Sequence, residues 1–170
     1  MLVLLMRKSP FLLILCLSTI MSMAHGPAHE RIARLTKKIE KNPNDYSLYI
    51  DRAGLYKIDG QFDKSYSDYM KANSLNPNLP NMDYMLAELF YDFDYYESSL
   101  IHIASFQKLN RSLAECYLFK AKIYDKMFQP DSALHYAEAS YEYQTKPSTH
   151  YFITVKEYAL FADKTDYAKA

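Results

Sequence analysis

The sequence predicts an all-α protein, a stack of antiparallel helical hairpins, and three observations lead to this fold class. Only 3 of the 170 residues are Gly, too few for the many tight turns of a sheet-rich fold. Between Tyr46 and Leu75 apolar residues recur every three or four positions, which is the spacing of one helical face. Prolines divide the rest of the chain into helix-sized segments, at Pro27, Pro43, Pro77, Pro80, Pro130 and Pro147.

Residues 1–24 are predicted to be a signal peptide. Arg7 and Lys8 precede an apolar run over 11–20, and small residues at alternate positions end at Ala24. Cleavage after Ala24 would export the protein, to a periplasm or out of the cell, and leave it without a membrane span. The alternative is an uncleaved segment that anchors the protein, although the apolar run is short for a bilayer.

Similar residues recur along the chain at one fixed interval, which is the mark of a stacked repeat. Ala53 is followed at this interval by Ala87 and Ala121, and Tyr56 is followed by Phe90 and Tyr124. We call this interval of about 34 residues the repeat period. The small residues are expected where the two helices of a hairpin approach most closely, with the aromatic residues beside them. The prediction is a capping helix within 25–43, hairpins over about 45–77, 79–111 and 113–146, and a partial fourth hairpin or C-terminal helix up to residue 170.

A helical hairpin of this length, with aromatic, small and proline residues at these offsets, resembles the tetratricopeptide repeat. The first hairpin carries the resemblance best, through Tyr49, Ala53, Tyr56, Tyr69, Ala72 and Pro77. Arg52 and Ser65 depart from it, because the motif usually has Leu and Ala there. The resemblance implies a right-handed superhelical α-solenoid, a role as a non-catalytic scaffold for protein–protein interaction, and a concave groove lined by the first helix of each hairpin.

The groove that the resemblance implies would carry a mixture of Tyr, apolar and charged side chains. By the register of the repeat, the predicted partner-binding residues are Lys57, Tyr84, Glu88, Tyr91, Leu118, Lys122, Asp125, Phe152 and Lys156. Such a groove suits an extended or helical peptide, and the alternative is a solvated face with scattered aromatic residues. Tyr84 and Tyr91 are predicted to lie off the inward-packing face, as anchors for a partner. Ile50 and Gly54 replace the Lys and Asn of the family's clamp for acidic chaperone tails, which disfavours that partner.

Other residues with chemical potential are predicted to be structural. Tyrosines at helical spacing are assigned to the core, namely Tyr49, Tyr56, Tyr66, Tyr69, Tyr117 and Tyr124. Cys116 is predicted to be a buried apolar residue, and the alternatives are an intermolecular disulfide or a nucleophile. The acidic residues Asp92, Asp94 and Glu97 lack the spacing and the glycine of a calcium loop.

No combination of residues indicates catalysis, so the sequence predicts no enzyme, no cofactor and no metal site. Lys and Arg together number 20, as do Asp and Glu, so no basic excess favours nucleic acid. The predicted partner is a protein or a peptide. The alternative function is a self-associating accessory subunit of an envelope or secretion assembly, a homo-oligomer formed through the C-terminal end of the stack.

Overall fold

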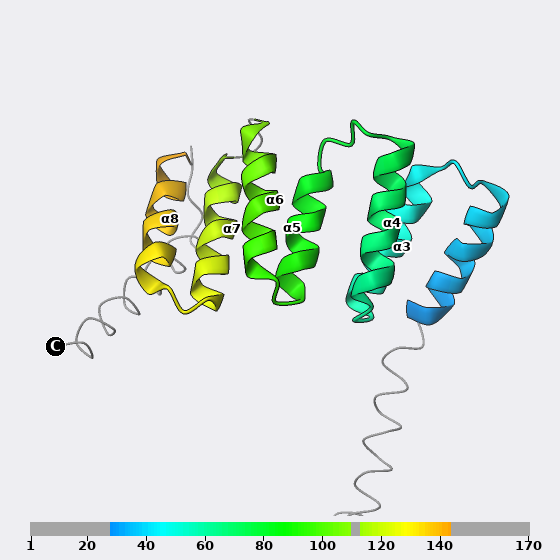
Figure 1. Ribbon diagram of the computed structural model, residues 1–170, viewed down its shortest axis with the longest axis horizontal. Helices are drawn as coiled ribbons and strands as arrows, with labels where there is room; N and C mark the ends of the chain where they lie inside the picture. The colour runs from blue at the N-terminus through cyan, green and yellow to red at the C-terminus, as the bar shows by residue number, and fades with distance from the viewer. Residues whose placement is uncertain (1–27, 110–112, 144–170) are drawn as a thin grey trace, which may run out of the picture. The chain divides into compact units, whose positions relative to one another are not determined.

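The computed structural model describes residues 28–109 and 113–143, which form seven helices and no strand (Figure 1). The predicted all-α class is therefore confirmed. The helices are 28–41, α3 (Tyr46–Ile58), α4 (Phe62–Leu75), α5 (Met82–Asp92), α6 (Tyr96–Lys108), α7 (Leu113–Lys126) and α8 (Pro130–Glu142). The chain divides into two compact units, the N-terminal unit (Met1–Pro77) and the C-terminal unit (Asn78–Ala170).

The hairpins α3–α4, α5–α6 and α7–α8 are closed by turns of one geometry. Each turn contains one residue in the left-handed region, and these residues lie one repeat period apart: Gly60 (φ 74°), Asp94 (φ 63°) and Phe128 (φ 56°). The next residue donates its backbone N–H to the carbonyl five positions earlier, from Gln61 to Tyr56 (2.8 Å), Tyr95 to Phe90 (2.9 Å) and Gln129 to Tyr124 (2.9 Å). The first helix of each hairpin therefore ends in the same way, and the backbone conformation of the turn recurs at the repeat period.

Small, buried side chains recur at the positions predicted for the close approach of the two helices of each hairpin. The residues on the first helices are Ala53, Ala87 and Ala121, all with no exposed surface. In the first hairpin the Ser65 hydroxyl of α4 donates to the Ala53 carbonyl of α3 at 2.8 Å. In the second, Ser99 of α6 donates to the Ala87 carbonyl of α5 at 2.7 Å. The third hairpin has the buried Ala133 at this position, which brings a methyl group and no hydroxyl.

Helix 28–41 contacts the first hairpin through its apolar side. Ile32 and Ile39 on this side are buried. The hydroxyl of Thr36, which lies between them, accepts a hydrogen bond from Arg52 Nη1 of α3 at 3.0 Å. Since residues three and four apart share a side of a helix, this apolar side is the one that faces α3.

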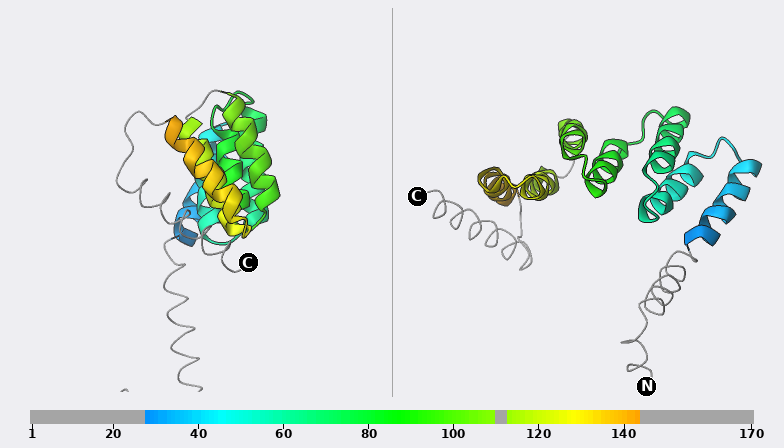
Figure 2. Two further views of the ribbon diagram at one scale, coloured as in Figure 1. Left: turned by 90° about the vertical axis from the view of Figure 1, so that its left-hand side faces the viewer. Right: turned by 60° about the horizontal axis from the view of Figure 1, so that its bottom comes forward.

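The C-terminal unit has a continuous core that joins its two hairpins. Its buried members come from α5, α6 and α7 and are Ala87, Ile103, Phe106, Cys116, Phe119 and Ile123. The right-hand panel of Figure 2 shows the two hairpins of this unit, drawn in green and in yellow to orange, side by side. Cys116 has no exposed surface, and burial raises the pKa of its thiol. It lies in the core as a small apolar side chain would, as predicted.

Four positions of each hairpin, three on the first helix and one on the second, form a further contact that we call the lateral cluster. Its members recur at the repeat period and are Tyr49, Arg52, Tyr56 and Asp68 in α3–α4; Asp83, Leu86, Phe90 and His102 in α5–α6; and Tyr117, Lys120, Tyr124 and Tyr136 in α7–α8. The positions are the same in the three hairpins, but the chemistry of the side chains differs.

In the first hairpin the lateral cluster is ionic. Arg52 donates from Nε to Asp68 Oδ2 (2.7 Å) and from Nη2 to Asp68 Oδ1 (2.8 Å), which makes a bidentate pair. Only 15% of the Arg52 side chain and 8% of the Asp68 side chain are exposed. The guanidinium also lies 5.8 Å from the ring centroid of Tyr49 and 5.7 Å from that of Tyr56. The hydrogen bond to Asp68 raises the pKa of Arg52, so the carboxylate stabilises the charged form of the guanidinium.

In the second hairpin the lateral cluster combines a polar contact with an aromatic one. His102 Nδ1 lies 2.9 Å from Asp83 Oδ1. The His102 ring stacks on Phe90, with centroids 5.3 Å apart and 7° between the ring planes. Leu86 replaces the arginine of the first hairpin and is buried.

In the third hairpin the lateral cluster is a row of tyrosines. Tyr136 stacks on Tyr124 at 5.1 Å and on Tyr117 at 6.2 Å, and Tyr117 stacks on Tyr143 at 5.2 Å. Lys120 Nζ lies 5.6 Å from the ring centroids of both Tyr117 and Tyr136. The ammonium group therefore takes the place of the guanidinium in the first hairpin, but with rings in place of a carboxylate.

One predicted core tyrosine is not in the core. Tyr66 is 36% exposed, and its assignment to the core was wrong. The side of α4 that faces α3 carries Ser65, Tyr69 and Ala72, which are all buried. Tyr66 follows Ser65 directly, so it lies on an adjacent side of the helix. There it stacks on Phe62, with ring centroids 6.0 Å apart.

Several predictions fall outside the described residues. They are the signal peptide over 1–24 and the partial fourth hairpin beyond residue 146. The right-handed superhelix also stays a prediction, because it concerns the arrangement of the whole stack.

Candidate functional site

The predicted partner-binding residues of the C-terminal unit lie on α5 and α7, the first helices of its two hairpins. They are Tyr84, Glu88, Tyr91, Leu118, Lys122 and Asp125, and we call this surface the α5–α7 face. Because members on one helix are three or four residues apart, each set occupies one side of its helix.

The rings of Tyr84 and Tyr91 pack against α7. Both contact the ring of Phe119, with centroid distances of 5.9 Å and 5.4 Å. Tyr84 also contacts Phe106 at 5.2 Å, and Tyr91 contacts Tyr96 at 6.0 Å. The two tyrosines are thus half-buried against the core of the unit.

The prediction that Tyr84 and Tyr91 lie off the inward-packing face was therefore wrong. A first helix in a stack is covered both by its own hairpin and by the next one, and the periodicity within one helix does not reveal the second contact. Phe119, which is 9% exposed, supplies this second contact from α7. Each tyrosine ring stabilises the junction between the hairpins while part of it remains at the surface. That a partner binds them stays a prediction.

Charged side chains lie beside the two rings. Burial raises the pKa of the Tyr91 hydroxyl, and the negative charge of Asp125 raises it further. Asp125 on α7 is therefore near Tyr91 on α5. Lys122 is exposed one turn before Asp125, and Glu88 is half-buried three residues before Tyr91. Aromatic edges with both signs of charge next to them can bind a peptide through ring contacts and through its polar groups.

The remaining three predicted groove residues are not part of α5 or α7. Lys57 is half-buried on α3 and belongs to the N-terminal unit. Phe152 and Lys156 lie outside the described residues. Leu118, by contrast, is half-buried on α7 as part of the α5–α7 face.

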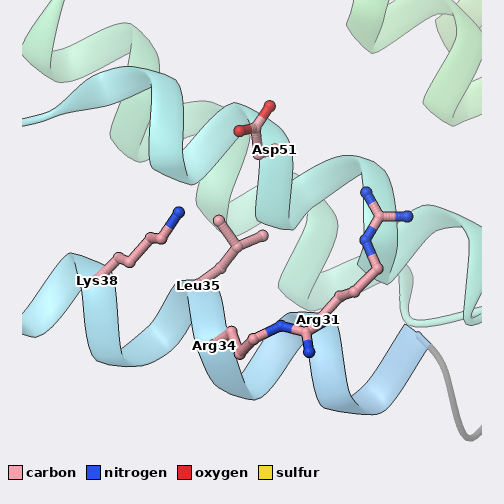
Figure 3. Close-up of a pocket in the computed structure, with 5 residues that line it drawn as sticks. All are labelled: Arg31, Arg34, Leu35, Lys38 and Asp51. Carbon is pink, nitrogen blue, oxygen red and sulfur yellow. The ribbon is translucent and has the colours of Figure 1, made fainter.

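A cavity in the N-terminal unit was missed by the reasoning from sequence. It has a volume of about 320 Å³ and is lined by Arg31, Arg34, Leu35, Lys38 and Asp51 (Figure 3). Figure 3 shows the first four on helix 28–41 and Asp51 on α3. A signal was available, because the period that aligns the hairpins also extends backward into residues 28–41.

Two properties of the described residues bear on function. No helix among them is long and apolar enough to cross a membrane. In residues 28–109 and 113–143, no three or more His, Cys, Asp and Glu side chains are grouped so that they could hold a metal ion.

Comparison with known proteins gives no match by sequence and clear matches by structure. No protein-family model and no curated protein matches the sequence. The structure of MamA from Desulfovibrio magneticus RS-1, residue 41 to the end, is similar with a TM-score of 0.66 and 14% identity, over 86% of this chain and 82% of that one. PilF of Pseudomonas aeruginosa is similar with a TM-score of 0.64 and 13% identity, over 85% and 66% of the two chains.

A third similar structure is YrrB, described as a TPR protein with an unusual peptide-binding site. Its TM-score is 0.56 at 19% identity, over 79% of this chain and 69% of that one. This chain has the tetratricopeptide-repeat fold. The predicted resemblance is confirmed at the level of the fold, in agreement with the regular spacing of left-handed turns and buried alanines. At 13% to 19% identity these likenesses establish the fold alone.

Proposed function

We propose that this tetratricopeptide-fold protein is a non-catalytic, exported scaffold that binds a peptide segment of a partner protein on its α5–α7 face. The observation that carries the proposal is the pair of half-buried rings, Tyr84 and Tyr91, held by Phe119 beside groups of both charges. The peptide-binding site described for YrrB, which has a similar fold, supports a peptide as the ligand. The signal-like sequence over 1–24 supports export.

The α5–α7 face would bind through prepositioned groups. Because Phe119 already holds the two tyrosine rings, a peptide that contacts their edges would lose little additional side-chain entropy on the protein side. Lys122 and Asp125 would select the peptide by charge and set its direction. Binding to this face involves no covalent step, and reversible binding is sufficient for a scaffold.

Site-specific photo-cross-linking in the native organism tests this function. A photoreactive phenylalanine analogue is placed at Lys122, which is exposed, and in a matched control at Glu97, which is exposed on the second helix α6. We expect a partner adduct from position 122 and none from position 97. Equal adducts from both positions, or none from 122 at any growth stage, would contradict binding on the α5–α7 face.

Export is tested separately by N-terminal sequencing of the protein isolated from outside the cytoplasm. The expected first residue is His25, following cleavage after Ala24. A protein that is found only in the cytoplasm, with residues 1–24 still attached, would contradict export and leave the proposal for the α5–α7 face standing.

A further inference from the structure

Helix 28–41 corresponds to the second helix of a hairpin. A shift of one repeat period superimposes its bounds on those of α4, Phe62–Leu75. The same shift pairs Arg31 with Ser65, Leu35 with Tyr69, and Lys38 with Ala72. Ser65, Tyr69 and Ala72 are the buried residues with which α4 packs on its first helix, α3. The side of helix 28–41 that carries Arg31, Leu35 and Lys38 is therefore the side on which a first helix would lie.

Asp51 on α3 faces the same place. A shift of two repeat periods pairs Asp51 with Phe119 on α7. Phe119 is the residue that packs on Tyr84 and Tyr91 of the preceding first helix, α5. Asp51 therefore occupies the position that contacts a preceding first helix. Among the described residues, this place holds the cavity of about 320 Å³ rather than a helix (Figure 3).

The lining of the cavity is mainly cationic. Arg31 and Lys38 are exposed, and within the described residues neither forms an ion pair. They lie two helical turns apart, a rise of roughly 10 Å, with Leu35 between them. Arg34 forms a surface pair with Glu30 at 3.3 Å, and Asp51 is the acidic member of the lining. Charged groups thus occupy positions that α4 fills with Ser65 and Ala72.

The chain's own sequence does not match this lining. One period before α3 lie residues 12–24, which are apolar and contain no Asp or Glu. Such a helix would bring no counter-charge as it covered Arg31 and Lys38, and Asp51 can offset at most one of these two charges. An uncompensated charge is costly to bury. An occupant with two acidic residues two turns apart would instead pair with both cations.

We infer that the cavity is a docking site for an acidic amphipathic helix of a partner protein, which lies where the first helix of a hairpin would pack on helix 28–41. Its two carboxylates, seven residues apart, would pair with Arg31 and Lys38, and an apolar residue between them would contact Leu35. This site lies in the N-terminal unit and is separate from the α5–α7 face, so it stands or falls independently of the function proposed there.

Peptide binding measured by fluorescence anisotropy tests the site. The protein is the chain from His25 onward, which keeps every described residue. The probe is a labelled alanine-based helical peptide of about 20 residues, with two Glu seven positions apart and a Leu midway between them. We expect binding that weakens at least about tenfold when both Glu of the peptide become Gln, and that weakens as salt is added.

Variants of the protein locate the binding. Arg31→Gln with Lys38→Gln should weaken the Glu peptide at least about tenfold, whereas Lys37→Gln with Lys41→Gln should change it less than about twofold. The control pair lies on the same helix, is exposed and removes the same charge, but lies outside the cavity lining. Both double variants should melt like the parent, since all four side chains are exposed. The reversed variant, Arg31→Glu with Lys38→Glu, should bind a peptide with Lys in place of both Glu.

Four results would overturn the inference. They are no binding of the Glu peptide, equal binding of the Gln peptide, equal loss in the control pair, and failure of the reversed variant to bind the Lys peptide. Light scattering addresses the remaining occupant: concentration-dependent dimers that disappear with Arg31→Gln and Lys38→Gln would replace the partner helix by a second copy of this chain.

Discussion

The lateral clusters of α3–α4 and α7–α8 occupy the same positions two periods apart and use different chemistry. In α3–α4 the first helix holds the second through the bidentate pair of Arg52 and Asp68. In α7–α8 it does so through the stacked rings of Tyr117, Tyr124 and Tyr136 around Lys120. The backbone register, rather than the identity of the side chains, is therefore what repeats in this protein.

The two solutions should respond differently to the loss of one member. A mostly buried ion pair depends on both partners, because removal of one leaves the other charge desolvated and unpaired. A row of rings depends on contact area and on several weaker ring contacts, so the loss of one ring removes only a part of it. The first and last of the four predictions that follow use this difference, and the other two compare further equivalent positions of the first and third hairpins.

Asp68→Ala should lower the free energy of unfolding by about 3 kcal/mol, because it leaves the guanidinium of Arg52 buried without its carboxylate. The matched change at the equivalent position of the third hairpin, Tyr136→Leu, should cost only about 1 kcal/mol. Urea denaturation followed by circular dichroism measures both.

A double variant provides the control for Asp68→Ala. Replacing both partners with apolar residues, Arg52→Met with Asp68→Leu, should recover most of the lost stability, because no unpaired charge remains. If Asp68→Ala costs no more than Tyr136→Leu, the two lateral clusters are energetically alike and the distinction between them fails.

Ser65→Ala should cost about 1 kcal/mol, since it removes the buried hydrogen bond to the Ala53 carbonyl. The third hairpin already has the buried Ala133 at this position. The reciprocal change, Ala133→Ser, should therefore stay within about 0.5 kcal/mol of the parent if the hydroxyl finds the Ala121 carbonyl. A loss above about 2 kcal/mol for Ala133→Ser would mean that the third hairpin is packed too closely to accept the serine.

Phe128→Gly should stabilise the protein by about 0.5–1 kcal/mol, because the left-handed conformation costs a non-glycine residue about 1–2 kcal/mol and the greater entropy of an unfolded glycine offsets part of the gain. The first hairpin has Gly60 at this position, and Phe128 is 84% exposed, so little packing would be lost. Thermal melting of the variant and the parent measures the gain. Phe128→Ala is the control, since it removes the ring and keeps the strain; an equal gain from it would contradict the backbone explanation.

The tyrosine row should make the C-terminal unit sensitive to alkali. Burial raises the pKa of Tyr124, and a hydrogen bond with Tyr117 raises that of Tyr143. The folded state therefore holds these protons longer than the unfolded state, so their contribution is present below about pH 10 and is lost as the pH rises further. Melting temperature should fall above that pH, and Tyr124→Phe with Tyr143→Phe should make the fall less steep. An unchanged slope in this variant would show that other groups cause it.

The helical hairpins could be predicted from the sequence because their signals are local. Apolar spacing of three and four, Gly60 in a turn, and the recurrence of Ala53 at Ala87 and Ala121 each depend on residues close together or at one fixed interval. The burial of these alanines could be predicted in this way, and the burial of Cys116 could be predicted from its place in a helical pattern. For the same reason the tetratricopeptide fold could be anticipated even though no family model matches.

The repeating unit could be predicted from the sequence alone. The contacts that each side chain makes with neighbouring helices, by contrast, required the tertiary structure. The pattern of α5 shows that Tyr84 and Tyr91 occupy one side of the helix, but only the position of Phe119 shows that this side is half-covered. Arg52 was visible as a departure from the motif, yet its partner Asp68 lies 16 positions away on the next helix. The cavity beside Arg31 and Lys38 depends likewise on Asp51, which comes from another helix. Contacts between helices can be satisfied by an ion pair, a ring or a methyl group, so the residue types alone do not specify them, whereas the backbone hydrogen bonds of a helix follow from a short stretch of chain.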